Sequence, residues 1–394
     1  MTNISREFER KIRARLKEKS PLIQVLIGPR QVGKTTAIKQ IFVDQGIYFS
    51  ADSPIPLSTD EIETLWRQAL ALKNPLLAID EIQKIPGWSE TIKKLWDQSE
   101  KKIKLVLLVS AALAIEKDLK ESLAGRYELI RIEHWNYSEA AECFKMNFDD
   151  FIEFGCYPGS HSLLPDRQRW SAYIRDSIVE PAIGRDILQL HPVQNPTLLR
   201  QIFSICIGHP AQIVSLNKLQ GLLQDRGAMA TLQHYLELLG YGFLVTGVMK
   251  YSANMIRTRS SPPKLIVHDN ALIRAFERPN NEKPNANRMG HYLENAIGAR
   301  FIEAGWETTY WKDKNYEVDF VVLGPDGEKW AIEVKTKPPA ESELKGLFQF
   351  CKLNPEFQPI VVCPNIESEG VNLPKVRFLS AERILKLSRD NGIS

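Results

Sequence analysis

The sequence has few cysteines, and none of them form a close pair. Its 5 cysteines stand far apart and include no C-x-x-C arrangement. This spacing argues against a disulfide framework and against a cysteine zinc site. We therefore expect the chain to work in a reducing compartment, the cytoplasm.

Long hydrophobic runs and a strong net charge are also missing. No apolar run approaches the roughly 20 residues of a membrane-spanning helix, and the start of the chain is charged from Arg6 onward. We expect neither a signal peptide nor a membrane partner. The net charge of +3 is too small to indicate nucleic-acid binding by itself, so such a partner must be argued from local clusters.

What the sequence does have is an ordinary globular composition, with 43% hydrophobic and 25% charged residues. Its 394 residues exceed the size of a single core, so several domains are expected. Strand-like and helix-like segments alternate over residues 22–132, which predicts an α/β domain with a parallel sheet and helices on both faces. We place the domains at 1–136 (P-loop domain), 137–196 (helical), 197–276 (winged helix) and 290–394 (α/β).

The most specific motif lies near the start of the α/β pattern. Residues 28–36 read GPRQVGKTT and match G-x-x-x-x-G-K-[ST], between a predicted strand at 22–27 and a predicted helix at 37–42. This arrangement directs backbone N–H groups and a helix dipole at one point, which suits the phosphates of ATP. A chance match is the alternative. The predicted nucleotide-binding residues are Gly28, Pro29, Arg30, Gln31, Val32, Gly33, Lys34, Thr35 and Thr36.

Two carboxylates complete this predicted site. Asp80 and Glu81 close an apolar segment of strand length. We expect Lys34 to reach the phosphates, Thr35 and Asp80 to hold Mg²⁺, and Glu81 to orient and deprotonate water. The alternative is a solvated acidic pair at the end of a core strand.

The middle of the chain predicts a winged helix-turn-helix. Helical segments at 197–207, 216–223 and 229–239 precede a strand-like segment at 243–245. Residues 249–264 carry four basic residues, Lys264 among them, and no acidic one, so this stretch either lies along a phosphate backbone or is a solvated or interface loop. Three of the 7 histidines, His134, His209 and His268, are predicted to have core or surface roles and to form no ligand pair.

Carboxylates recur in the last domain. Asp319 lies in one predicted strand and Glu333 and Lys335 in the next, and an antiparallel hairpin can bring them together. Such a set, with Glu294 from the preceding helix, could hold Mg²⁺ for phosphodiester cleavage, with Lys335 neutralising charge. A surface ion-pair cluster is the alternative.

The chain resembles prokaryotic ATP-binding proteins that have an AAA-type P-loop domain, a winged-helix middle and a C-terminal domain of unknown function. The segments that carry the resemblance are GPRQVGKTT, LLAIDEIQKIPGW, ESLAGRYELIRI, GRDI, GHYLEN, EVDFVV and WAIEVK. It implies that the last domain has a restriction-endonuclease-like core of the PD-(D/E)xK type, with Glu294, Asp319, Glu333 and Lys335 at the matching positions.

The resemblance also implies roles for two further residues. Arg126 would be an arginine finger that acts in a neighbouring subunit of a homo-oligomer, although a loop arginine paired to a carboxylate is an equal alternative. Relatives have hydroxyl residues after the fourth strand, where this chain keeps only Ser110 before Ala111 and Ala112. Ser110 is thus the predicted sensor of the γ-phosphate, and Arg185 and Asp186 are predicted to form a structural ion pair.

These patterns predict an Mg-ATP-binding protein and slow ATPase whose nucleotide state repositions a winged helix and a nuclease-like domain that acts on nucleic acid, with DNA as the expected partner. The alternative is a nucleotide-gated DNA- or protein-binding switch in which that domain cuts nothing. A signalling switch without a nucleic-acid partner is a third possibility.

Overall fold

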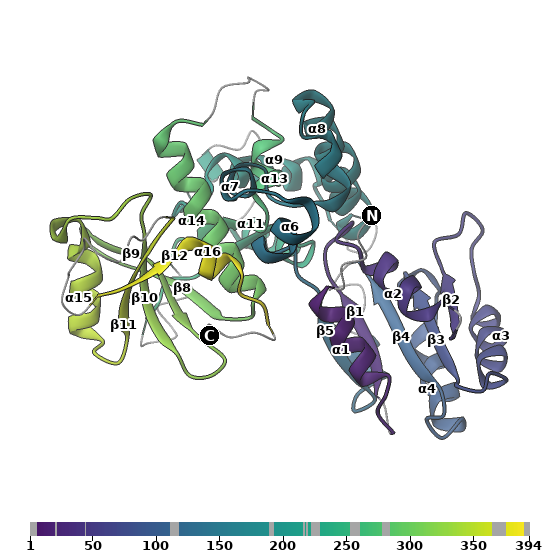
Figure 1. Cartoon of the computed structure of the whole chain (residues 1–394). Coiled ribbons are helices and arrows are strands. Elements are labelled where there is room, and N and C mark those ends of the chain that lie inside the picture. Colours follow the sequence, from purple (N-terminus) through teal and green to yellow (C-terminus); the bar gives the residue numbers. More distant parts are fainter. Residues whose placement is uncertain are drawn as a thin grey trace. The chain divides into compact units, whose positions relative to one another are not determined.

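The computed structural model describes residues 6–19, 22–43, 45–110, 118–188, 193–215, 217, 220–221, 229–252, 261–277, 284–364 and 376–389. The chain divides into two compact units (Figure 1). One comprises Met1–Glu133 with Gly184–Pro192, and the other His134–Ile183 with Val193–Ser394. No helix in the described ranges is both long and apolar enough to cross a bilayer.

The first unit is built on a five-stranded parallel sheet with strand order β2-β3-β4-β1-β5. Strands β1 and β3 are buried along their whole length. Because alternate residues point to opposite faces, this burial requires cover on both faces of the sheet. The α/β fold with a parallel sheet is therefore confirmed. Its elements are α1 (Glu7–Arg15), β1 (Ile23–Ile27), α2 (Lys34–Phe42), β2 (Ile47–Ser50), α3 (Thr59–Leu70), β3 (Leu76–Asp80), η1 (Ile82–Lys84), α4 (Trp88–Gln98), β4 (Lys104–Val109) and β5 (Tyr127–Arg131).

The second unit begins with helices, and η4, a helical segment of the region predicted at 137–196, continues into the first unit. Two segments of this region, η3 and η4, are π-helical. The elements are α6 (Tyr137–Phe144), α7 (Phe148–Phe154), η2 (Pro158–Leu163), α8 (Arg167–Tyr173), η3 (Ile174–Val179), η4 (Ala182–Ile187) and α9 (Pro196–Gly208). The boundary between the two units falls inside η4.

The region predicted as a winged helix contains α9, α11 (Met229–Tyr241) and the antiparallel pair β6 (Val245–Val248) and β7 (Lys264–Val267), followed by α13 (Asn270–Arg274). Most of the middle helix that the sequence predicts at 216–223 lies outside the described residues. The winged helix therefore stays a prediction.

The last region is a mixed five-stranded sheet in the order β12-β11-β10-β9-β8. The predicted hairpin β9–β10 forms, and β11 and β12 join it in parallel, but β12 and α16 were not predicted. The elements are α14 (Ala286–Glu303), β8 (Glu307–Asp313), β9 (Tyr316–Leu323), β10 (Lys329–Val334), η5 (Glu341–Leu344), α15 (Lys345–Leu353), β11 (Gln358–Cys363), β12 (Arg377–Ser380) and α16 (Ala381–Leu385).

Apart from residues 184–192, which belong to the first unit, the predicted domain at 137–196 shares one unit with those at 197–276 and 290–394, and α14 contacts all three. This helix contacts α7 of the helical region, β7 of the middle region and β8 of the last sheet. Its residues Tyr292, Ile297 and Phe301 are fully buried. A helix that is apolar on several sides is typical of a core shared by neighbouring elements.

Candidate nucleotide-binding site

The loop between β1 and α2 has the backbone of a phosphate-binding loop. Gly33 is the N-cap of α2 with φ 94°, a left-handed conformation that glycine adopts without strain. A Cβ at Gly28 would lie 2.5 Å from the carbonyl oxygen of Ile132, so only glycine fits there. No side chain caps α2, and its N-terminus therefore presents backbone N–H groups and the positive end of its dipole to the loop.

Lys34 places a positive charge in this loop. Its side chain is buried, and Nζ donates to the carbonyl oxygens of Gly28 at 2.7 Å and Pro29 at 2.5 Å. Burial lowers the pKa of Lys34 to about 8, against the opposing charges of Glu81 and Asp80. A phosphate bound at this point would stabilise the charged form of Lys34, which burial disfavours.

Thr35 and Asp80, predicted to hold the cation together, meet in the structure. The Thr35 hydroxyl donates to Asp80 Oδ2 at 2.6 Å, and the Tyr48 hydroxyl donates to the same oxygen at 2.8 Å. A hydroxyl and a carboxylate oxygen at adjacent strand and helix ends are the donor types that Mg²⁺ prefers. These residues therefore fit the predicted cation.

Glu81 lies beside them in a strained conformation. Its φ is 54°, a left-handed value that is uncommon for residues other than glycine and that clusters at functional sites. The Ser110 hydroxyl lies 3.1 Å from Glu81 Oε2 and 3.2 Å from Asp186 Oδ1. A hydroxyl has one proton to donate, so Ser110 donates to one of these two carboxylates at a time while lying close to both.

Asp186 corrects the sequence analysis. The predicted Arg185–Asp186 pair is not formed: Arg185 is exposed, and Asp186 accepts from Arg30 Nε and Nη2, each at 2.5 Å. Adjacent residues on a helical turn point in different directions, which disfavours the predicted pair. The two partners are 156 positions apart in sequence, so no local pattern could have revealed the contact.

The remaining predicted loop residues differ in exposure. Val32 has its side chain in the core, and its carbonyl accepts from Arg6 Nη1 at 2.8 Å. Gln31 and Thr36 are exposed. Val32 can therefore meet a ligand only through its backbone.

Arg126 makes the carboxylate pair that was the alternative to an arginine finger. Its Nε and Nη2 donate to the two carboxylate oxygens of Asp97 at 2.9 and 2.8 Å. A role in a second subunit would require this exposed pair to open, at modest cost.

Comparison with known proteins agrees with this geometry. Residues 20–141 match the family model of an AAA domain, and residues 145–283 and 289–380 match two domains of unknown function, DUF8612 and DUF4143. Residues 20–141, most of which lie in the first unit, are therefore similar to AAA domains. Nucleotide binding is thereby supported.

Uncharacterized proteins are among the relatives. One from Methanocaldococcus jannaschii is 27% identical over 78% of this chain and 73% of its own length, and one from Mycobacterium tuberculosis is 26% identical over 80% and 70%. Similar solved structures include an Aeropyrum pernix Orc1 protein in complex with DNA (TM-score 0.31, 13% identity, 69% of this chain and 92% of that one). Another is AMPPCP-bound DnaA from Aquifex aeolicus (TM-score 0.30, 14% identity, 60% and 89%).

In the second unit, the carboxylates predicted for the last domain gather around an unpredicted lysine. Lys264 on β7 is fully buried, with Nζ 2.5 Å from Glu294 Oε1 and 3.6 Å from Asp319 Oδ1. Burial opposes its charge, but the two carboxylates prevail and raise the pKa of Lys264 above its usual value. Of the basic residues in the stretch 249–264, Lys264 is thus too deeply buried to contact a phosphate backbone, whereas residues 253–260 lie outside the described ranges.

Glu333 and Lys335 form an ion pair next to Val334, whose backbone contacts Asp319. Lys335 Nζ is 2.7 Å from Glu333 Oε1, and the backbone N–H of Val334 donates to Asp319 Oδ2 at 2.8 Å. Burial and the charge of Asp319 raise the pKa of Glu333, although Lys335 opposes the shift. The predicted metal ligands Glu294, Asp319 and Glu333 therefore lie in one ion-pair cluster.

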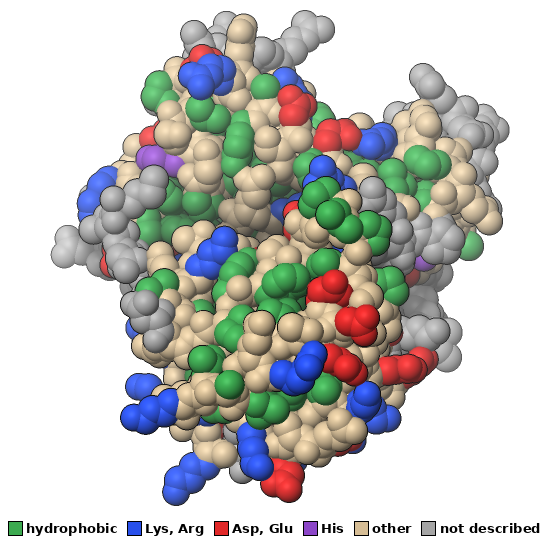
Figure 2. All heavy atoms as spheres, turned by 90° about the vertical axis from the view of Figure 1, so that its right-hand side faces the viewer, with side chains coloured by type: hydrophobic (Ala, Val, Ile, Leu, Met, Phe, Trp, Pro, Cys, Tyr) green, Lys and Arg blue, Asp and Glu red, His purple; other side chains and the backbone are tan. Residues whose placement is uncertain are grey.

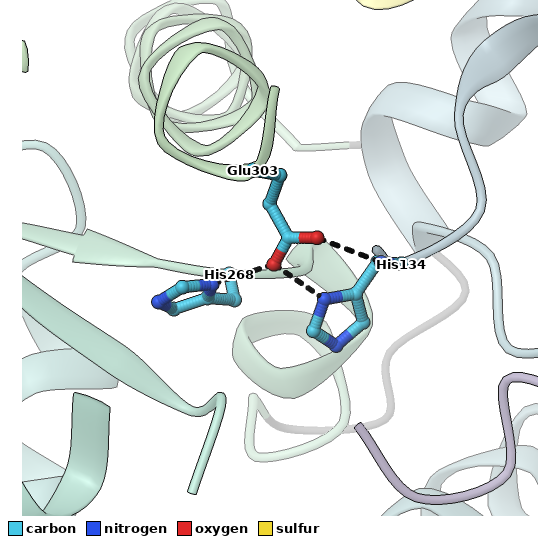
Figure 3. A group of neighbouring side chains, drawn as sticks. All are labelled: His134, His268 and Glu303. Atoms are coloured by element: carbon cyan, nitrogen blue, oxygen red, sulfur yellow. Dashed lines mark hydrogen bonds and ion pairs between the residues drawn. The ribbon is translucent and has the colours of Figure 1, made fainter. Parts of the chain in front are cut away.

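His134 and His268 are buried, as expected of core residues, but they were not expected to lie together. His134 and His268 meet at Glu303, and these three residues form the one set in the described ranges that offers three ligand atoms within 4.8 Å (Figure 3). Their Nδ1 atoms lie 2.8 and 2.7 Å from Glu303 Oε1. The other ring nitrogens face the hydroxyls of Tyr157 and Thr246.

This histidine cluster is satisfied by hydrogen bonds alone. With a proton on each Nδ1, both rings donate to Glu303, and the two hydroxyls donate to the Nε2 atoms. Burial opposes ionisation of Glu303, but the interactions with His134 and His268 hold its pKa well below its usual value. The cluster ties β7, α14 and the start of the second unit together.

Proposed function

We propose that the first unit binds Mg-ATP and hydrolyses it slowly. The observation that carries this proposal is the convergence of the buried Lys34 ammonium, the Thr35–Asp80 contact of 2.6 Å and the strained Glu81 around one uncapped helix N-terminus. The match of residues 20–141 to an AAA domain supports it.

Each residue has a role in this proposal. Thr35 and Asp80 would hold Mg²⁺, which when bound neutralises phosphate charge. Lys34 binds the terminal phosphates and loses its contacts with the Gly28 and Pro29 carbonyls. Glu81, oriented by Ser110, accepts a proton from the attacking water.

Substitution of Lys34 tests the proposal. Lys34→Ala leaves phosphate charge uncompensated in the loop, and we expect the affinity for ATP to fall by about 100-fold or more, equivalent to about 2.7 kcal/mol. Isothermal titration calorimetry measures this. Lys39→Ala is the matched control, because Lys39 lies on the same helix but is exposed. Equal ATP affinity in both variants would refute the proposal.

We further propose that the second unit acts on nucleic acid under the control of the nucleotide. The nearness of Glu294, Asp319 and Glu333 favours cleavage, but these three do not bring their ligand atoms within 4.8 Å of one another, and Lys264 favours the alternative of a domain that binds without cutting. The Lys264 ammonium neutralises Glu294 and Asp319, two of the groups that would otherwise attract a divalent cation. Figure 2 faces the side on which the elements β2, α3 and α4 of the first unit lie in Figure 1, and basic and acidic side chains are interspersed there, so this view says nothing about a basic surface on the second unit.

Plasmid incubation separates cleavage from binding. The full chain is incubated with supercoiled plasmid, ATP and Mg²⁺ or Mn²⁺, and compared with Glu333→Ala. Cleavage that disappears in the variant supports the nuclease. Retarded but intact plasmid supports the binding switch, and unchanged mobility removes the nucleic-acid partner.

A further inference from the structure

Asp186 lies in the first unit and contacts two residues of the candidate nucleotide-binding site. It is buried, with 5% of its surface exposed, although the chain on its N-terminal side belongs to the second unit. Buried carboxylates are costly unless paired. The partners of Asp186 are a phosphate-loop residue, Arg30, and the candidate γ-phosphate sensor, Ser110.

The contact with Arg30 uses the groups that would bind a phosphate. Arginine recognises phosphate through a fork of two parallel N–H donors. In Arg30 the Nε and Nη2 donors each contact a different oxygen of Asp186 at 2.5 Å. This fork is therefore committed to Asp186.

The negative charge of Asp186 also acts on Lys34, the lysine of the phosphate loop. It is one of the three carboxylates that counter the lowering of the Lys34 pKa, together with Glu81 and Asp80. A terminal phosphate near Lys34 would have the same sign as Asp186, and like charges a few ångströms apart repel. The Asp186 carboxylate and a terminal phosphate would thus compete for the same cationic groups, Arg30 and Lys34.

We infer that Asp186 is an internal competitor of the terminal phosphate of ATP. In the nucleotide-free chain Asp186 holds Arg30 and Ser110, and binding of a triphosphate displaces it. A diphosphate, which lacks the terminal group, leaves it in place. This inference rests on the proposed function and assigns that site its regulation.

The position of Asp186 makes its release consequential. It lies in the π-helical segment η4, and π-helical turns are rare and concentrate at functional sites. The segment continues along the chain into the second unit. Displacement of Asp186 therefore acts on the covalent connection between the two units.

The test compares the affinities of Asp186→Asn for two nucleotides in the full-length protein. With Mg²⁺ present, we expect the variant to bind the non-hydrolysable triphosphate AMPPCP about tenfold more tightly than the wild type, a typical coupling between sites. The affinity for ADP should change by less than about twofold, since ADP lacks the competing group. Calorimetry gives both values. Glu128→Gln is the control, because it breaks another arginine pair of this unit, with Arg15.

A merely structural Asp186 predicts a different pattern. In that case the variant binds both nucleotides more weakly, or both unchanged, and the inference is overturned. A second measurement needs no variant: hydrogen exchange of the wild-type amides at 184–188 should rise with AMPPCP and not with ADP. Equal exchange with both nucleotides overturns the inference, while a wild type that binds neither overturns the proposed function itself.

Discussion

The phosphate loop and the carboxylate cluster of the second unit both place a lysine ammonium inside the protein, but they hold it differently. Lys34 contacts main-chain carbonyls of its own loop, whereas Lys264 contacts the side chains of Glu294 and Asp319. The first arrangement keeps its carboxylates available for a ligand. The second uses an internal cation to balance its carboxylates.

The two lysines therefore differ in whether an added anion would stabilise their charge. Burial leaves Lys34 with a pKa of about 8, so an anionic ligand would improve its environment. The pKa of Lys264 is raised by its partners, so its environment is already favourable. We therefore expect substitutions in the loop to change binding and substitutions at Lys264 to change stability.

Removal of Lys264 should have the largest effect. Lys264→Met leaves the partly buried carboxylates of Glu294 and Asp319 without a counter-charge, which costs up to about 3–5 kcal/mol of stability at neutral pH. Urea unfolding measures this. The cost should shrink as the pH falls, because Glu294, whose pKa burial already raises, then takes up a proton. Lys312→Met, which breaks an exposed pair with Glu317, should change little.

The same variant decides whether the carboxylate cluster can accept a metal. If Mn²⁺ restores the stability of Lys264→Met and leaves the wild type unaffected, the lysine occupies a cation position. Equal effects of Mn²⁺ on both proteins would break the comparison, since the cluster would then behave as a closed ion pair.

Glu81→Gln should lower ATP hydrolysis by about 100- to 1,000-fold, the usual contribution of a positioned general base, and leave ATP affinity within a few-fold. The amide keeps the shape of the side chain but cannot accept the proton. Phosphate release and calorimetry measure the two quantities. Hydrolysis at the wild-type rate would show that another group activates the water.

The smallest predicted effect concerns pH. The free protein has a Lys34 pKa of about 8, and bound phosphate favours the charged form and raises that pKa. Below pH 8 the lysine is already charged, while above it binding must take up a proton, so affinity falls by up to about tenfold per pH unit. Calorimetry at pH 7, 8 and 9 checks this. A flat profile in Lys34→Arg, whose guanidinium stays charged, is the control.

Sequence reasoning found the parts of the molecule that are local. Gly28, Lys34 and Thr35 lie in one contiguous motif, and Asp80 closes a strand whose burial is visible in its composition. Parallel strands end at the same edge of a sheet, so Thr35 and Asp80 could be placed together.

The missed parts are pairings between distant segments. Asp186 reaches Arg30 across 156 positions, and Lys264 reaches Asp319 across 55. His134 and His268 share Glu303 through tertiary packing alone. Single charged residues of this kind carry no periodic pattern, and only the fold decides which of them are buried together.

The return of Gly184–Pro192 to the first unit limits how this chain can be divided. A fragment ending at Glu133 would keep every residue of the phosphate loop, yet its Arg30 would have lost the carboxylate that holds it. The complete nucleotide-binding unit therefore cannot be moved to another protein as one continuous segment that ends at Glu133.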